Sequence, residues 1–179
     1  VNEWTCVEPD SKLCEAILNS SISNLSSIKI HNGFSKSLTS AQYDCMIYID
    51  VLEHIEDDMN EIMIAWDKLK VNGYLVTLSP AFQYFYSNFD QVIGHYRRYN
   101  KSSLASIVPH ELFDQRELYY LDSMGVFASL ANKWFLKQEI PTIEQVQMWD
   151  TKIVPMSRIF DKLLHPFFGK SIVGVWQKR

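Results

Sequence analysis

The stretch from residue 43 to residue 81 limits the possible folds more than any other part of the chain. It opens with an apolar run, Tyr43–Ile49, that has the length of a strand and stops at Asp50. Apolar positions then recur at helical spacing over residues 62–69, and residues 74–78 form a second strand-like run. An apolar strand, a helix and another strand in this order predict a parallel α/β sheet.

The predicted helix has recognisable ends. Asp58 and Glu61 stand three residues apart, as in a capping box, and acidic residues suit the positive end of the helix dipole. Asn72 and Gly73 tolerate a positive φ, so we expect the helix to stop there. Pro80 has no backbone N–H to donate, which predicts the end of the second strand.

A polar cluster follows directly after the first of these strands. In open α/β sheets, ligands bind beyond the carboxyl ends of the parallel strands. The sequence therefore predicts a binding site near the members of this cluster, which are Asp50, Glu53, His54, Glu56, Asp57 and Asp58.

Three segments together resemble the class I S-adenosylmethionine-dependent methyltransferases. They are DVLEHIEDD at 50–58, LKVNGYLVTLSPA at 69–81 and DQVIGHYRRYNKSSL at 90–104. The resemblance implies a Rossmann-like, mostly parallel sheet with helices on both faces. It also implies an antiparallel C-terminal strand inserted at the sheet edge and a helical cap near the C-terminus.

The resemblance further implies how the chain is organised. Residues 1–179 are expected to form a single methyltransferase domain, with an active-site loop at 82–100 and the helical cap at 123–168. Asn100 suits the cap of the helix that follows the loop. The remaining elements expected along the chain are a strand within 4–10, a helix at 11–19, and strands at 28–31, 117–121 and 171–176.

S-Adenosylmethionine is the cofactor that the resemblance implies. Glu8 stands where the family's acidic residue binds the ribose hydroxyls, and a carboxylate offers two acceptor oxygens to a diol. Asn32 and Gly33 fall beside the adenine ring, although an Asn-Gly pair is equally typical of an ordinary turn. Asp50 and Leu52 are the other residues expected to contact the cofactor.

The glycine-rich turn of the family, of the G-x-G type, has no counterpart in this sequence. None of the six glycines lies two residues from another. Such a turn lets the backbone approach the cofactor closely. We therefore expect an N-terminally incomplete domain, either a fragment of a longer gene product or a protein that has lost its cofactor loop.

Residues 82–99 combine many aromatic and charged side chains at the predicted active site. His95, and after it His54, are the candidate catalytic bases, because the unperturbed pKa of histidine, roughly 6.5, is close to neutral. The resemblance points to a substrate-binding set made of Tyr86, Asp90, Arg97, Arg98 and Tyr99.

A structural interpretation of the same residues is also open. His54 would then bond a neighbouring carbonyl, and the two arginines would tie loops to carboxylates. In a mixed interpretation, one arginine braces the loop by a bidentate pair while the other faces an anionic part of the substrate.

Composition excludes several partners. The formal net charge of -4 and the sequence pI of about 5.7 provide no bulk attraction to nucleic acid. No apolar run approaches the roughly 20 residues of a membrane span. Cys6, Cys14 and Cys45 are widely spaced, which favours free thiols in a reducing, cytoplasmic compartment.

Apolar residues also recur at helical spacing in the expected cap. They are Phe127, Leu130, Ala131, Trp134 and Phe135, with a further apolar set at 153–168. Core or lid packing is the main interpretation of this pattern. A hydrophobic acceptor pocket or the face of a homodimer is the alternative.

These features predict a methyltransferase that acts on a small-molecule or lipid-like acceptor. The expected chemistry is direct in-line displacement at the sulfonium methyl, with no metal required. One alternative is a non-catalytic binding or assembly module derived from the same fold. A nucleotide-binding oxidoreductase would fit the doubly wound pattern, but not the segments at 50–58 and 90–104.

Overall fold

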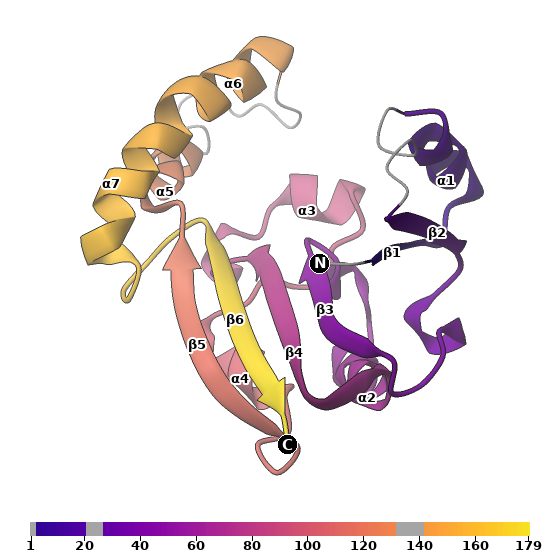
Figure 1. Cartoon of the computed structure of the whole chain (residues 1–179). Helices are drawn as coiled ribbons and strands as arrows, with labels where there is room; N and C mark the ends of the chain where they lie inside the picture. Colours follow the sequence, from indigo (N-terminus) through magenta and orange to yellow (C-terminus); the bar gives the residue numbers. More distant parts are fainter. Residues whose placement is uncertain (1–2, 21–26, 132–141) are drawn as a thin grey trace. The chain divides into compact units, whose positions relative to one another are not determined.

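The computed structural model describes residues 3–20, 27–131 and 142–179. They belong to two compact units, Val1–Ser40 and Ala41–Arg179 (Figure 1). Each unit has a parallel strand pair of its own.

The first unit is built around one strand–helix–strand repeat. Strand β1 (Trp4–Glu8) and strand β2 (Ile28–Asn32) pair in parallel, and helix α1 (Ser11–Leu18) lies between them in the chain. Asp10 caps α1 by accepting hydrogen bonds from the N–H groups of Lys12 and Leu13. A short 3-10 helix, η2 (Ser35–Ser37), follows β2. The strands and the helix confirm the elements expected here.

The second unit contains a four-stranded sheet in the order β3-β4-β6-β5. Strands β3 (Tyr43–Ile49) and β4 (Leu69–Pro80) are parallel. Strand β6 (Ser171–Lys178) is antiparallel to β4 and also to β5 (Phe113–Leu121). This mixed α/β sheet, with its antiparallel C-terminal strand, is the predicted fold class.

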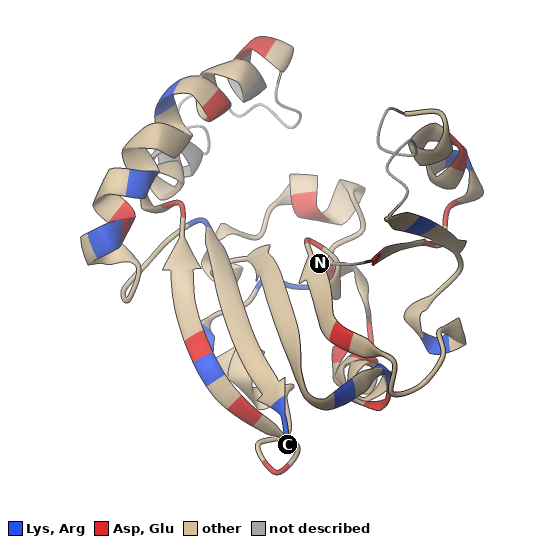
Figure 2. Cartoon of the chain, in the orientation of Figure 1, with Lys and Arg blue, Asp and Glu red and all other residues tan. Residues whose placement is uncertain are grey.

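The position of β6 corrects one expectation. It lies between β4 and β5 and not at the sheet edge (Figure 1). Its sequence suits an interior strand, because Ile172 and Val173 point to opposite faces and both are buried. Figure 2 shows little charge along β4 and β6, as expected for strands with a neighbour on each side.

The core of this unit lies on one face of the sheet. Helix α2 (Asp58–Lys68) and helix α4 (Lys101–Ser106) lie behind the sheet in Figure 1. Asn100 caps α4 as predicted, accepting from the Ser103 N–H. The buried side chains that pack together here include Ile62, Ala65, Leu75, Leu104, Ile107, Ile172 and Trp176.

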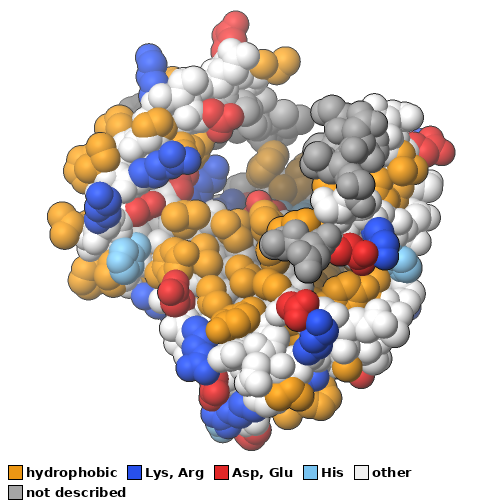
Figure 3. All heavy atoms as spheres, viewed as in Figure 1, with side chains coloured by type: hydrophobic (Ala, Val, Ile, Leu, Met, Phe, Trp, Pro, Cys, Tyr) orange, Lys and Arg blue, Asp and Glu red, His pale blue; other side chains and the backbone are white. Residues whose placement is uncertain are grey.

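The opposite face of β3 and β4 carries apolar side chains that are only partly covered. Ile47 is 41% exposed and Ile49 is 59% exposed. Their ladder partners, Val76 and Leu78, are partly buried. Figure 3 shows hydrophobic side chains gathered over the sheet on this side.

Both predicted ends of helix α2 need correction. Asp57 is the residue that caps the helix, accepting from the Asn60 N–H, and Asp58 is the first helical residue. Asp58 is buried and pairs with Arg97, so its side chain is not available as a cap. At the other end the helix stops at Lys68, and Asn72 with its φ of 64° lies inside β4.

Helices follow β5 in the region where the cap is expected. They are α5 (Ser123–Ala131), α6 (Ile143–Met148), a π-helical turn η6 (Trp149–Ile153) and α7 (Val154–Leu164). The predicted apolar residues Trp134 and Phe135, and the side chains of Leu130 and Ala131, lie outside the described residues. Among the helices of the described ranges, none has the length and apolarity needed to cross a membrane.

Two carboxylates hold these helices to the end of β5. The Asp161 carboxylate on α7 accepts from the backbone N–H groups of Asp122 and Ser123, at 2.9 Å and 2.8 Å. The Asp122 carboxylate in turn accepts from the Gly125 N–H, the Trp149 indole and the Ser157 hydroxyl. The described part of the cap is therefore joined to the end of β5 by partly buried polar contacts.

Candidate functional site

The candidate site lies beyond the carboxyl ends of β3 and β4, within the second unit. After β3 the chain forms a 3-10 turn, η3 (Leu52–His54), which carries Glu53 and His54. After β4 come a second 3-10 turn, η4 (Gln83–Phe85), and a short helix, α3 (Asn88–Val92). The Tyr96 N–H donates to the Glu53 carbonyl at 2.8 Å, which ties the second loop to the first.

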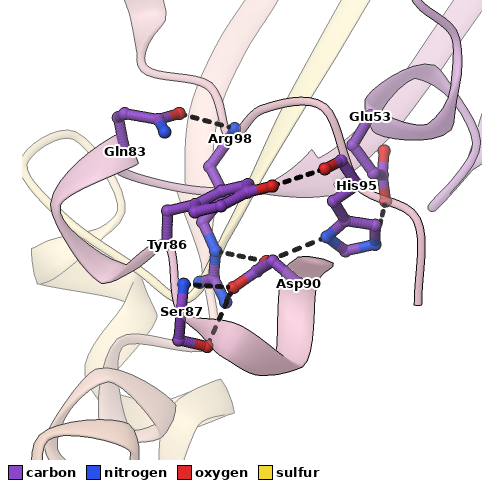
Figure 4. Close-up of polar contacts among 7 residues, drawn as sticks. All are labelled: Glu53, Gln83, Tyr86, Ser87, Asp90, His95 and Arg98. Atoms are coloured by element: carbon purple, nitrogen blue, oxygen red, sulfur yellow. Dashed lines mark hydrogen bonds and ion pairs between the residues drawn. The ribbon is translucent and has the colours of Figure 1, made fainter. Parts of the chain in front are cut away.

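The Asp90 carboxylate holds the loop after β4 together through several hydrogen bonds. Its side chain is fully buried, and it accepts two hydrogen bonds from Arg98, at 2.8 Å from Nε and 2.9 Å from Nη2. It also accepts from the N–H and the hydroxyl of Ser87 and lies 2.9 Å from His95 Nδ1 (Figure 4). Burial acts to raise the pKa of Asp90, but the bonds from Arg98 and His95 hold it below its ordinary value.

His95 is oriented by this carboxylate. An ionised Asp90 can only accept, so the hydrogen of the imidazole lies on Nδ1 and the lone pair lies on Nε2. The loop position is fixed by the Tyr86 hydroxyl, which donates to the His95 carbonyl at 2.6 Å. The Nε2 lone pair therefore points away from Asp90 and toward Glu53, whose Oε1 is 3.9 Å away (Figure 4).

Glu53 is a buried carboxylate that lacks a well-formed hydrogen bond. Its side chain is 0% exposed, and neither oxygen has a partner of hydrogen-bond geometry within the described parts of the chain. Burial raises the pKa of Glu53 to about 7; its own backbone N–H and the nearby Ser79 hydroxyl act to lower the pKa, and the charge of Asp50 acts to raise it. Burial also raises the pKa of Asp50, which follows directly after β3 and has a φ of 50°.

His54 is the exposed member of this group. Its ring meets the ring of His95 edge to face, with 4.5 Å between the centroids. Burial of part of the ring, and then the proximity of His95, lower the pKa of His54. Glu53, His54 and His95 each offer a possible ligand atom, and these atoms lie within 4.8 Å of one another.

Arg97 and Tyr99 brace the same loop on its other side. Arg97 lies 2.6 Å from an Asp58 oxygen and donates to the Glu56 carbonyl at 2.7 Å. The buried Tyr99 hydroxyl is 2.7 Å from Asp58 Oδ2 and 3.2 Å from the Leu52 carbonyl. Burial, followed by the contact with Asp58, raises the pKa of Tyr99.

Most of the predicted substrate-binding residues are already paired with other groups of the protein. Asp90 and Tyr99 are buried and paired within the protein, and Arg98 braces the loop through the bidentate pair that the mixed interpretation expected. Arg97 is also paired with a carboxylate. Direct contact of these residues and Tyr86 with a substrate stays a prediction. Asp90 and Tyr86 hold His95 by hydrogen bonds, and Arg98 holds Asp90.

The predicted cofactor residues fall into two groups. Glu8, Asn32 and Gly33 come together where β1 and β2 end, because the Asn32 side chain donates to the Glu8 carbonyl at 3.1 Å and the Gly33 N–H donates to the same oxygen. The carboxylate of Glu8 accepts the Asp10 N–H through Oε1. Asp50 and the buried Leu52 belong to the site of the second unit.

Sequence reasoning missed two residues of this site. The sequence predicts Glu53 as a member of the polar cluster and, in the structural interpretation, as a possible partner of an arginine, but not as a catalytic or binding residue. The later loop is tied to Glu53 through the Tyr96 N–H, a contact that the sequence does not show. Lys170 precedes β6, and burial lowers its pKa. The positive charge of Arg98 lowers this pKa further, whereas the negative charges of Asp122 and Asp50 act to raise it. No local sequence signal marks Lys170, because these partners lie far from it in the chain.

Comparisons with known proteins agree on the fold. No protein-family model matches the sequence, and a search of curated proteins found no match. Among solved structures, an S-adenosylmethionine-dependent methyltransferase from Mesorhizobium loti is 10% identical, with a TM-score of 0.61. The match covers 99% of this chain and 81% of that one.

Two further structures show the range of activities found on this fold. The N-methyltransferase NodS from Bradyrhizobium japonicum WM9, in complex with S-adenosyl-L-homocysteine, is 11% identical with a TM-score of 0.55, covering 98% of this chain and 66% of that one. The [4+2]-cyclase SpnF is 13% identical with a TM-score of 0.60, at the same coverage of 98% and 66%. The chain therefore has the class I methyltransferase fold.

Proposed function

We propose that this protein is an S-adenosylmethionine-dependent methyltransferase that acts on a small-molecule or lipid-like acceptor. The observation that carries the proposal is a histidine held by a buried aspartate, His95 on Asp90, at the carboxyl edge of a methyltransferase sheet. This is the edge where ligands of open α/β sheets bind. A cytoplasmic location and a homodimer are further predictions from the sequence.

The residues present fit the ribose part of the cofactor. Glu8 ends a parallel strand with a half-buried carboxylate, of which Oε1 accepts one backbone N–H. That leaves acceptor capacity for the two hydroxyls of a diol. Asn32 and Gly33 hold the turn beside Glu8 within the first unit. Contact of Asp50 and Leu52 with the cofactor stays a prediction from the sequence. When bound, the cofactor supplies the activated methyl group.

His95 is the proposed base that takes a proton from the substrate as the substrate receives the methyl group. Asp90 fixes the tautomer that leaves Nε2 free, and the same carboxylate stabilises the imidazolium once the proton has been taken up. Tyr86 and Tyr96 hold the loop that positions the ring. His54 is the second candidate, because its lowered pKa leaves it neutral near pH 7.

The proposed cofactor binding can be tested by calorimetry. S-Adenosylhomocysteine and S-adenosylmethionine are titrated into this chain and into the full-length product of its gene. We expect saturable binding, and we expect Glu8→Ala to weaken the affinity by about tenfold or more. A loss of this size corresponds to the removal of a pair of charge-assisted hydrogen bonds. Glu15→Ala, at an exposed site on α1, is the matched control and should leave affinity unchanged.

A non-catalytic binding module is the second candidate function. It is favoured by one observation, which is that the sequence lacks a G-x-G turn for the cofactor. In that case neither protein in the titration binds either compound, and the methyltransferase proposal fails.

A further inference from the structure

Three possible metal ligands converge beyond the carboxyl end of β3. Glu53 and His54 come from η3, and His95 comes from the loop after α3, about forty residues later in the chain. We propose that Glu53, His54 and His95 bind a divalent first-row transition-metal ion such as Zn²⁺ or Co²⁺.

The first argument is the unpaired state of Glu53. Three carboxylates are buried in the described part of the chain, namely Glu53, Asp58 and Asp90. Asp58 pairs with Arg97, and Asp90 pairs with Arg98 and His95. Of the three, only Glu53 has no ion pair with an arginine and no hydrogen bond of good geometry on either oxygen, its nearest polar groups being its own N–H and the Ser79 hydroxyl. A buried carboxylate in that state is disfavoured unless a cation or a proton compensates its charge.

The second argument is the orientation of His95. Histidines that bind metal ions usually donate the hydrogen of the other ring nitrogen to a carboxylate or a carbonyl, which fixes the tautomer and the ring. The Asp90 carboxylate is placed 2.9 Å from His95 Nδ1 in this manner. The lone pair of Nε2 is thereby presented to the space in front of Glu53 (Figure 4).

The third argument is the distance between the two ligand atoms. His95 Nε2 and Glu53 Oε1 are 3.9 Å apart, which is too long for a hydrogen bond. With two metal–ligand bonds of about 2.1 Å, an ion bonded to both atoms needs them about 3.4 Å apart at a tetrahedral angle and about 4.2 Å apart at an angle of 180°. The observed separation lies between these limits.

The fourth argument is the chemistry of the ligand set. Two imidazoles and one carboxylate suit zinc and its first-row neighbours, whereas Mg²⁺ and Ca²⁺ prefer oxygen ligands alone. His54 is exposed, so an ion has a route from solvent to the site. Three protein ligands leave at least one coordination position for water or for a substrate oxygen.

This inference changes the role of His95 in the metal-loaded protein. With its Nε2 lone pair on the ion, His95 is a ligand and no longer a proton acceptor. The ion can then lower the pKa of a hydroxyl bound at its open position. This departs from the metal-free chemistry expected from the sequence. Metal binding itself does not depend on the proposed methyl transfer, so the two proposals fail separately.

The test is a metal titration of the chelator-stripped protein. Co²⁺ is added while its visible absorption is recorded, and Zn²⁺ binding is measured by calorimetry. We expect one equivalent of each ion to bind, and Glu53→Gln, His54→Ala and His95→Gln each to weaken binding by about tenfold or more. Mg²⁺ should not compete at equal concentration.

His110→Ala is the matched control. His110 is 91% exposed at its side chain and lies 3.1 Å from Glu111, so it offers a surface His–Glu pair of the same chemistry. This variant should keep the wild-type affinity. Circular dichroism checks that each variant is folded.

A measurement on the unmodified protein covers the case in which a variant fails to fold. Zn²⁺ should shift the ring-proton NMR signals of His54 and His95, while those of His31, His110 and His165 stay in place. The proposal is wrong if the wild-type protein binds neither ion, or if binding is unchanged in the three ligand variants. It is equally wrong if Zn²⁺ moves only the signals of the other histidines.

Discussion

Asp90 and His95 are joined twice, through their side chains at 2.9 Å and through the His95 N–H and the Asp90 carbonyl at 2.8 Å. The double contact closes the four residues between them into a compact loop. The same aspartate carries the bidentate pair with Arg98. The orientation of His95 is therefore coupled to the stability of the whole loop.

Replacing Asp90 by asparagine should destabilise the protein by about 3 kcal/mol or more, because it leaves the largely buried Arg98 without its countercharge. Urea denaturation measures the change. Asp114→Asn is the control, since Asp114 pairs with Arg179 on the surface and its loss should cost less than about 1 kcal/mol. Equal stability of the two variants would contradict the role given to Asp90.

Tyr99 should make the protein sensitive to alkali. Its pKa is raised in the folded state by burial and then by Asp58, so the folded protein holds the phenolic proton more tightly than the unfolded chain. The resulting stabilisation is complete below the unfolded pKa of about 10 and is lost as the pH rises above it. Urea midpoints measured from pH 8 to pH 11 should therefore fall less steeply for Tyr99→Phe than for the wild type.

Tyr84→Phe is the matched control for this pH series, because Tyr84 is exposed. It should follow the wild-type curve. Parallel curves for wild type and Tyr99→Phe would show that the Tyr99 hydroxyl contributes nothing to the alkaline transition.

The two faces of the sheet should differ in their sensitivity to mutation. Leu75 points into the core, so Leu75→Ala should cost about 2–5 kcal/mol through lost burial and a cavity. Ile47 lies on the opposite, partly exposed face, and Ile47→Ala should cost less than about 1 kcal/mol. Denaturant midpoints for both variants provide the comparison, and a larger cost at Ile47 would mean that this face is covered in solution.

His95→Gln should reduce methyl transfer by about a hundredfold or more if His95 takes up the proton of the acceptor. Transfer of a labelled methyl group from S-adenosylmethionine measures the rate, and His110→Gln serves as control. The assay is run with and without a chelator. Activity that the chelator abolishes identifies His95 as a metal ligand, whereas activity that resists the chelator identifies it as the proton acceptor. Full turnover by His95→Gln in both conditions excludes either role.

Much of the fold could be predicted because its signals are local. The run at Tyr43–Ile49, the helical spacing after it and the Asn100 cap each depend on residues close in the chain, and the structure has them all. The helix cap fell on Asp57 and not on Asp58 because Asp58 is held by Arg97, a partner about forty residues away.

Non-local contacts set the limit of prediction for the site. His95 could be singled out from its own segment, but its relation to Glu53 requires the loop after β4 to fold back onto η3. The place of β6 between β4 and β5 likewise depends on distant strand pairing, because β6 pairs with β4 across about ninety to one hundred residues and with β5 across about fifty to sixty-five. No spacing pattern in the sequence carries that information.

The central position of β6 has a consequence for the order in which the protein can assemble. β4 and β5 share no ladder, and each is joined to the other only through β6, which follows both of them in the chain. Until residues 171–178 have left the ribosome, β4 and β5 each expose an unpaired edge. Leu75 and Tyr120 then lack their ladder partners on β6, Trp176 and Ile172. A chain cut short just before residue 171 would therefore lack the strand that joins β4 to β5, and its sheet would be interrupted in the interior and not shortened at an edge.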